Sequence, residues 1–172
     1  MKRFLSLTTL VIFMSGPGLA ANQPDTQAEM KKMQEAQAKL MAATMWERKS
    51  RLGFNETVTA LQDAAKKRGW KVGEVVDMQA AMQKAGKKNT LPFKMLAMCR
   101  QDLAEKLLKE QAAQKAMPFA PCQISVFEGH DGKTYIVKPN TEVMAQLALP
   151  AFAPILKQFF EEEKAVLSGI TE

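Results

Sequence analysis

Apolar and polar positions along the chain switch between a period of about 3.6 residues, typical of helices, and the strict alternation of strands. The clearest helix spans residues 54–68, where Phe54, Val58 and Leu61 recur at helical spacing and Gly69 supplies the stop. Further helices are predicted at 26–40, 78–85, 102–114 and 140–147, and a last one, opened by Pro150 or Pro154, ends near residue 168.

Strands are predicted at 41–50, 70–76, 91–99 and 122–128, and a loop over residues 129–132 turns the last of these into a hairpin. The order of elements predicts an α+β domain, with a small sheet of about five strands and helices packed on one face, plus an N-terminal amphipathic helix and a C-terminal helix. A helix joins strands 91–99 and 122–128. We therefore expect a right-handed crossover between two parallel strands.

The first 20 residues have the pattern of a signal peptide. Lys2 and Arg3 precede an apolar run of about 11 residues, too short to span a bilayer, and small residues favour cleavage after Ala20. We expect an exported protein in the bacterial periplasm, with no stable membrane span after cleavage; an uncleaved anchor is the alternative. The rest divides into a linker and amphipathic helix (21–40), a core domain (41–140) and a C-terminal helical extension (141–172).

The charge of the chain is mildly basic. Its formal net charge of +6 falls to +4 without residues 1–20, which hold two basic residues and no acid. The remaining lysines and arginines are spread along the helices, whereas a nucleic-acid surface usually gathers them in one stripe. We therefore expect no nucleic-acid partner.

Three residues are candidates for chemistry: the two cysteines, Cys99 and Cys122, and the only histidine, His130. Parallel strands would place Cys99 at the end of one strand and Cys122 at the start of the other, roughly 23 Å away, beyond the reach of a disulfide. A pair of buried, inert thiols is then favoured over a disulfide. The same topology would separate Cys122 from His130 and bring Cys99 close to it.

Other groups give weaker indications. Met95, Met98 and Cys99 are soft ligands that suit Cu(I), but alternation turns Met98 to the opposite face, and methionine commonly fills cores. The run Glu161-Glu162-Glu163 is expected to be solvated. No nucleotide-binding, zinc-protease, C-x-x-C or serine-hydrolase motif occurs, so the sequence predicts no catalytic residue and identifies no cofactor or metal.

Several segments resemble a known family, and they are spread from about residue 41 to residue 140. They comprise KSRLGFNETV (49–58), GWKV (69–72), MLAMC (95–99), PCQISVFE (121–128) and DGKTY (131–135). These residues are similar to the family called domain of unknown function 302, in its cysteine-bearing branch. The resemblance implies a compact α+β domain that tends to form a homodimer, and recurrent cysteines at Cys99 and Cys122. It implies no reaction.

Three functions remain open on these grounds. The favoured one is a non-enzymatic, exported module that binds a small ligand or a protein partner. The second is a thiol-based redox or sulfur-handling protein that uses Cys99 and Cys122, which requires at least one accessible thiol of lowered pKa. The third is soft-metal or haem binding through cysteine, methionine and His130.

Overall fold

The computed structural model of the protein describes residues 26–109 and 121–172. Its first element is the helix α1 (Thr26–Thr44), and the chain divides into two compact units between Ala36 and Gln37. The predicted signal peptide lies outside the described residues. Among the helices that are described, none combines the length and the apolar character needed to cross a membrane.

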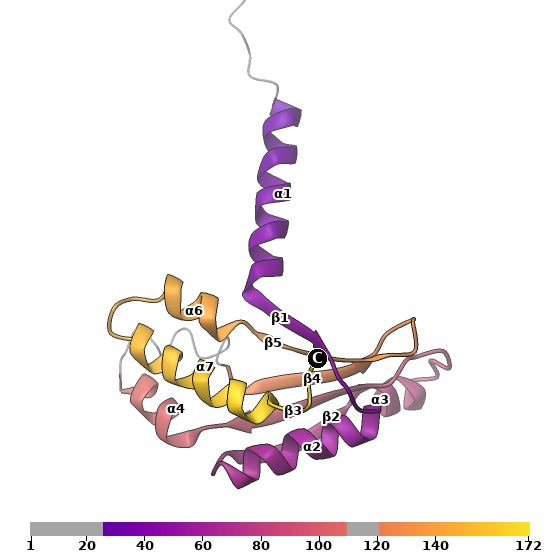
Figure 1. Ribbon diagram of the computed structural model, residues 1–172. Helices are drawn as coiled ribbons and strands as arrows, with labels where there is room; N and C mark the ends of the chain where they lie inside the picture. The colour runs from indigo at the N-terminus through magenta and orange to yellow at the C-terminus, as the bar shows by residue number, and fades with distance from the viewer. Residues whose placement is uncertain (1–25, 110–120) are drawn as a thin grey trace, which may run out of the picture. The chain divides into compact units, whose positions relative to one another are not determined.

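The second unit is built on a five-stranded sheet in the order β1-β5-β4-β3-β2, in which every pair of neighbours is antiparallel (Figure 1). Its strands are β1 (Met45–Lys49), β2 (Lys71–Asp77), β3 (Phe93–Cys99), β4 (Gln123–Glu128) and β5 (Thr134–Pro139). Its further helices are α2 (Phe54–Lys67), α3 (Met78–Lys84), α4 (Gln101–Leu108), α6 (Thr141–Leu147) and α7 (Ala153–Leu167). The α+β class and the C-terminal helix predicted from the sequence are confirmed.

Side-chain alternation places the core on the face of the sheet that α2 and α7 cover (Figure 1). This face carries buried apolar residues of three strands: Leu96, Met98, Ile124, Val126 and Ile136. The intervening residues point to the opposite face, where the rings of Phe93, Phe127 and Tyr135 stack in a row with centroids 6.1 and 5.4 Å apart.

Residues near the C-terminus complete this core. Val166 and Leu167 of α7 and the following Ile170 are buried in it. The backbone then joins the sheet edge, because the Glu172 N–H donates to the Lys49 carbonyl over 3.0 Å. The position of α7 on the sheet is therefore held at its far end by backbone hydrogen bonds as well as by packing.

The helix boundaries follow the expected local rules. Gly69 ends α2 with φ of 75°, a left-handed conformation that costs glycine little. Asp77 caps α3, its carboxylate accepting from the Ala80 N–H over 2.8 Å, and Asn140 caps α6 in the same manner. One boundary was predicted wrongly: residues 41–44 continue α1, since Met and Ala are strong helix formers, and the strand begins at Met45.

The expected parallel crossover is also wrong. Strands β3 and β4 are adjacent and antiparallel, with Phe93 opposite Phe127 and Ala97 opposite Gln123. After β3 ends, the connection that contains α4 leads back into β4 at the same end of the sheet. The right-handed rule applies to connections between parallel strands, which cross to the opposite end of the sheet, so it did not apply here. The predicted helix 102–114 is confirmed up to Leu108, and residues 110–114 lie outside the described residues.

Candidate functional site

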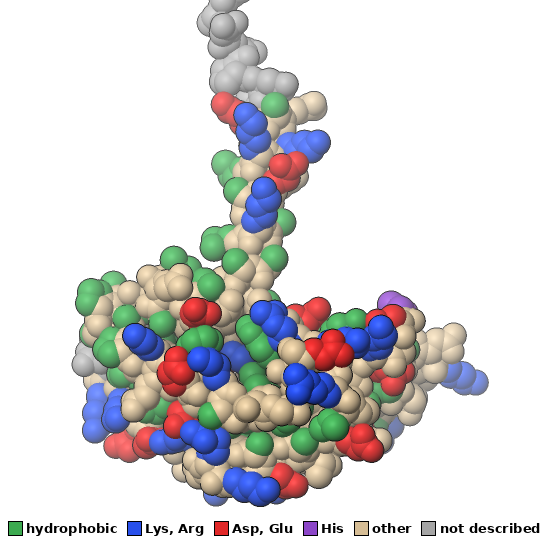
Figure 2. All heavy atoms as spheres, in the orientation of Figure 1, with side chains coloured by type: hydrophobic (Ala, Val, Ile, Leu, Met, Phe, Trp, Pro, Cys, Tyr) green, Lys and Arg blue, Asp and Glu red, His purple; other side chains and the backbone are tan. Residues whose placement is uncertain are grey.

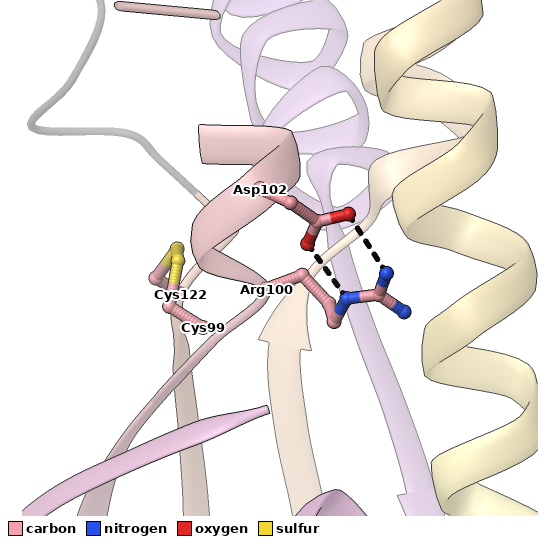
Figure 3. The surroundings of a disulfide bond; sticks show 4 residues. All are labelled: Cys99, Arg100, Asp102 and Cys122. Atoms are coloured by element: carbon pink, nitrogen blue, oxygen red, sulfur yellow. Dashed lines mark hydrogen bonds and ion pairs between the residues drawn. A yellow bond between two sulfur atoms is a disulfide. The ribbon is translucent and has the colours of Figure 1, made fainter. Parts of the chain in front are cut away.

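Cys99 and Cys122 form a disulfide at one end of the sheet, with their Cα atoms 4.6 Å apart (Figure 3). Cys99 ends β3 and Cys122 directly precedes β4, and the Met98 N–H donates to the Cys122 carbonyl over 2.9 Å. The expectation of two separated, free thiols is therefore wrong, because it rested on the parallel arrangement. Both cysteines are half-buried, and both line a surface pocket of about 580 Å³.

A network of ion pairs lies beside the disulfide. The Arg100 guanidinium points away from the sulfur atoms and donates two hydrogen bonds of 2.8 Å to Asp102 (Figure 3). It also lies 2.9 Å from Glu162 of α7, which accepts two further hydrogen bonds from Arg68. Burial acts to raise the pKa of Glu162, but Arg68 and Arg100 outweigh burial and lower it. This network joins α2, α4 and α7 and leaves Arg100 already paired.

His130 lies at the opposite end of the sheet, in the turn between β4 and β5. The Glu128 N–H donates to the Pro92 carbonyl, so this turn approaches the start of β3 and not Cys99 at its end. The expected proximity of His130 and Cys99 is therefore wrong, for the same topological reason. His130 itself is exposed. Of the three candidate residues, the structure brings only Cys99 and Cys122 together, and His130 lies at the other end of the sheet from them.

A site that the sequence did not indicate is formed by three buried polar residues on β5, α6 and α7. The Lys138 ammonium lies 2.7 Å from the Glu163 carboxylate, and their side chains are only 3% and 1% exposed. Lys138 also donates to the Thr141 hydroxyl over 3.3 Å and to the Pro139 carbonyl over 3.1 Å. Thr141 in turn donates to the same oxygen of Glu163, Oε2. The three N–H groups of Lys138 are thus all used.

The second oxygen of this carboxylate, Glu163 Oε1, is buried and has no hydrogen-bond partner among the described residues. Glu163 lines a pocket of about 210 Å³, here called the Glu163 pocket. Its lining residues come from β1, β5, α7 and the chain after α7: Trp46, Lys138, Phe160, Glu163, Lys164, Leu167, Ser168 and Thr171.

The electrostatics of the Glu163 pocket are set by burial and by cations. Burial raises the pKa of Glu163, although the nearby Lys138 charge acts to lower it. The Lys138 and Arg48 cations lie 5.3 and 5.2 Å from the Trp46 ring, and Lys164 lies 5.4 Å from the ring of Phe160. Glu163, whose buried Oε1 has no partner in the described chain, thus lines the pocket together with two aromatic rings that have cations close to them.

The expectation that the run 161–163 is solvated fails for Glu163 and has a visible reason. Buried residues of α7 recur at helical spacing: Leu156, Phe159, Glu163, Val166 and Leu167. Glu163 thus occupies a position of the apolar stripe, four residues after Phe159. Lys138 likewise continues the inward-facing alternation of Thr134 and Ile136 on β5. Two charged residues at core positions were the available indication of this site.

The described residues contain no group of three or more His, Cys, Asp or Glu side chains placed to hold a metal ion. On the face shown in Figure 2, positive and negative side chains are interspersed.

Comparison with known proteins places the chain among proteins of unassigned activity. The family model described as domain of unknown function DUF302 matches residues 46–170, thirty residues beyond the end expected from the sequence. A crystal structure of an uncharacterized conserved DUF302 protein from Bacillus stearothermophilus has a similar fold, with a TM-score of 0.62 and 24% sequence identity. The similarity covers 72% of this chain and 95% of that one. No curated protein matches the chain significantly.

Proposed function

The chain belongs to the DUF302 family, whose description names no activity, and from this premise we propose that it is a non-enzymatic binding module for a small ligand. The ligand lies in the Glu163 pocket. The observation that carries this proposal is the buried and unpartnered Oε1 of Glu163, a residue that lines the pocket. Native proteins pair nearly all such buried atoms, and carboxyl groups in pockets whose pKa is shifted by burial, as that of Glu163 is raised, are enriched at functional sites.

The chemistry of the pocket favours an uncharged ligand with a hydroxyl or amide N–H group. An ammonium group would meet the charges of Lys138, Lys164 and Arg48, which already surround the aromatic walls. An ionised carboxylate would be attracted by these cations, but it has no hydrogen to donate to Glu163 Oε1 and would place a second negative charge beside it. A neutral donor can satisfy Glu163 Oε1 without adding a charge to the pocket, and an apolar edge of the ligand can pack on Trp46 and Phe160.

Two further parts of the proposal concern where and in what form the module acts. The signal-peptide pattern of residues 1–20 supports export to the periplasm. The Cys99–Cys122 disulfide fits such an oxidising compartment. The resemblance to the family supports a homodimer, so each dimer would carry two equivalent Glu163 pockets.

The proposal is tested by amide chemical-shift mapping with probes of three charge types. Glycerol, glucose and N-acetylglucosamine represent neutral donors, acetate represents anions, and methylammonium represents cations. We expect the neutral probes to shift the amides of residues that line the pocket, among them Trp46, Glu163 and Thr171. The proposal is wrong if none of the neutral probes shifts these amides, or if a charged probe shifts them at least as strongly.

A substitution at Glu162, the residue before Glu163 on α7, serves as a control for general perturbation of the helix. Glu162→Gln removes a carboxylate charge one position before Glu163, from a side chain that pairs with Arg68 and Arg100 and does not line the pocket. We expect this variant to keep the response to the neutral probes. Loss of the response would mean that general perturbation of α7, and not the pocket, governs it.

Reversible disulfide chemistry is the second candidate, because Cys99 and Cys122 line the 580 Å³ pocket and are only half-buried. In this role a partner thiolate attacks one sulfur, forms a mixed disulfide and releases the other sulfur as a thiolate. Equilibration with glutathione buffers and thiol counting test it. A disulfide that stays oxidised across the range of cellular glutathione potentials contradicts this role and leaves the disulfide structural.

A further inference from the structure

We propose that a pocket beside α3 binds Cu(I) through the thioether sulfurs of Met78, Met82 and Met95. The pocket has a volume of about 430 Å³. Seven residues of α3, β3 and the segment before β3 line it: Met78, Gln79, Met82, Thr90, Leu91, Phe93 and Met95. This site is separate from the Glu163 pocket and shares no lining residue with it.

The fold brings these three methionines together from two elements. Met78 and Met82 are four residues apart on α3, so their side chains lie on the same side of the helix. Met95 lies on β3 opposite Val76, two residues before α3 begins. A methionine side chain has three rotatable bonds, which allows sulfur atoms around one pocket to converge on a small ion.

The chemistry of the lining selects a soft monovalent ion. Thioethers favour Cu(I), whereas Zn(II), Cu(II) and Mg(II) favour imidazole, carboxylate or water. None of the seven lining residues carries a charge, so the pocket offers no anionic ligand of the kind that divalent ions such as Mg(II) favour. The one buried polar atom of the lining without a partner in the described chain is the Thr90 hydroxyl oxygen, which could orient toward a bound cation.

The site differs from the soft-ligand set that the sequence indicated, Met95, Met98 and Cys99. Met98 is fully buried in the core on the other face of the sheet, and Cys99 is held in the disulfide. Only Met95 remains. Thioethers also suit an oxidising compartment, because they do not form disulfides and so stay available as ligands where thiols do not.

Methyl-labelled methionine provides a direct test in the full-length protein. Ag(I) serves as a redox-inert probe of the same charge, and Cu(I) is then added anaerobically with a competing chelator. We expect the methyl resonances of Met78, Met82 and Met95 to shift together and to saturate at one ion per chain. Equal shifts of the exposed Met30 and Met33, or no shift at the three pocket methionines, would overturn the proposal.

Substitution separates metal binding from apolar packing. Met78→Leu/Met82→Leu/Met95→Leu conserves side-chain volume, which usually costs little stability, and removes all three sulfurs. We expect Cu(I) affinity to fall by more than about tenfold. Changes to residues that only support the ligands of a metal commonly lower its affinity by about that factor, so the loss of the ligands themselves should exceed it. A control variant, Met30→Leu/Met33→Leu, should bind as the unchanged protein does. Unchanged Cu(I) binding by the triple variant contradicts the site, and the methyl shifts decide the question if that variant does not fold.

Discussion

The buried Lys138–Glu163 pair leads to an asymmetric prediction for stability. At a separation of 2.7 Å and an effective dielectric constant of about 20, the attraction between the two charges amounts to about 6 kcal/mol. Removing each ion from water costs several kcal/mol, so the two effects nearly cancel. The pair as a whole should therefore contribute little, whereas the removal of one partner should be expensive.

Only one of the two single substitutions should lose less stability in acid. In Lys138→Met, Glu163 can take up a proton and so avoid remaining as a buried, unpaired charge. The free energy of protonating a carboxyl group with the ordinary pKa of 4.5 is about 3 kcal/mol near pH 7 and about 0.7 kcal/mol near pH 5, and these values limit the loss of unfolding free energy. A raised pKa stabilises the fold below the ordinary value, and this contribution is lost as the pH rises through the folded value. Glu163→Leu instead leaves a buried ammonium, which acid cannot discharge, and should cost about 3–5 kcal/mol at both pH values.

Replacing all three polar residues tests the cancellation itself. Lys138→Met/Thr141→Val/Glu163→Leu leaves no member of the cluster unpaired, and its unfolding free energy should lie within about 1 kcal/mol of the unchanged protein or above it. Urea unfolding followed by circular dichroism at the two pH values measures each difference. A loss for Lys138→Met that does not shrink at the lower pH refutes the reasoning, as does a triple variant that loses the sum of the single effects.

Three further predictions concern other parts of the fold. Cys99→Ser/Cys122→Ser opens a link across 23 residues and should lower the unfolding free energy by about 3 kcal/mol in urea, an expectation that an unchanged midpoint would contradict. Glu162→Gln should lower the unfolding free energy by about 1–3 kcal/mol near pH 7, because Arg68 and Arg100 lose their carboxylate partner. This loss should shrink as the pH falls through the lowered pKa of Glu162, where the unchanged protein loses the same charge, and a pH-independent loss would refute the prediction. Gly129→Ala would place a Cβ 2.8 Å from the Asp131 carboxylate, so thermal unfolding should show a loss of about 1–3 kcal/mol, and full stability would show that the turn relaxes.

Local structure was predictable because it depends on neighbouring residues. The stop at Gly69, the cap at Asp77 and the alternation of β4 follow from backbone preference and periodicity, and each is found in the structure. The pairing of β3 with β4 depends instead on where the connection between them returns. A helix between two strands fits either direction, so the sequence did not decide whether Cys99 meets Cys122.

The candidate site was missed for a different reason. A run of three glutamates on a helix is ordinarily solvated, and nothing in the run itself distinguishes Glu163 from Glu162. The distinction comes from position, since Glu163 lies on the same stripe as Phe159 and Val166. Its partner, Lys138, is more than twenty residues away on a strand. Only the packing of α7 against the sheet brings the two together.

The measurement that tests the central claim most directly is the affinity of the Glu163 pocket for a neutral probe, with and without the buried residues Lys138, Thr141 and Glu163. The neutral probe that gives the largest amide shifts is titrated into the unchanged protein and into Lys138→Met/Thr141→Val/Glu163→Leu. If the Glu163 pocket is the binding site, the folded triple variant should lose the response of the pocket amides. Equal affinity for the probe in both proteins would show that the buried cluster serves only the fold, and would contradict the proposed function.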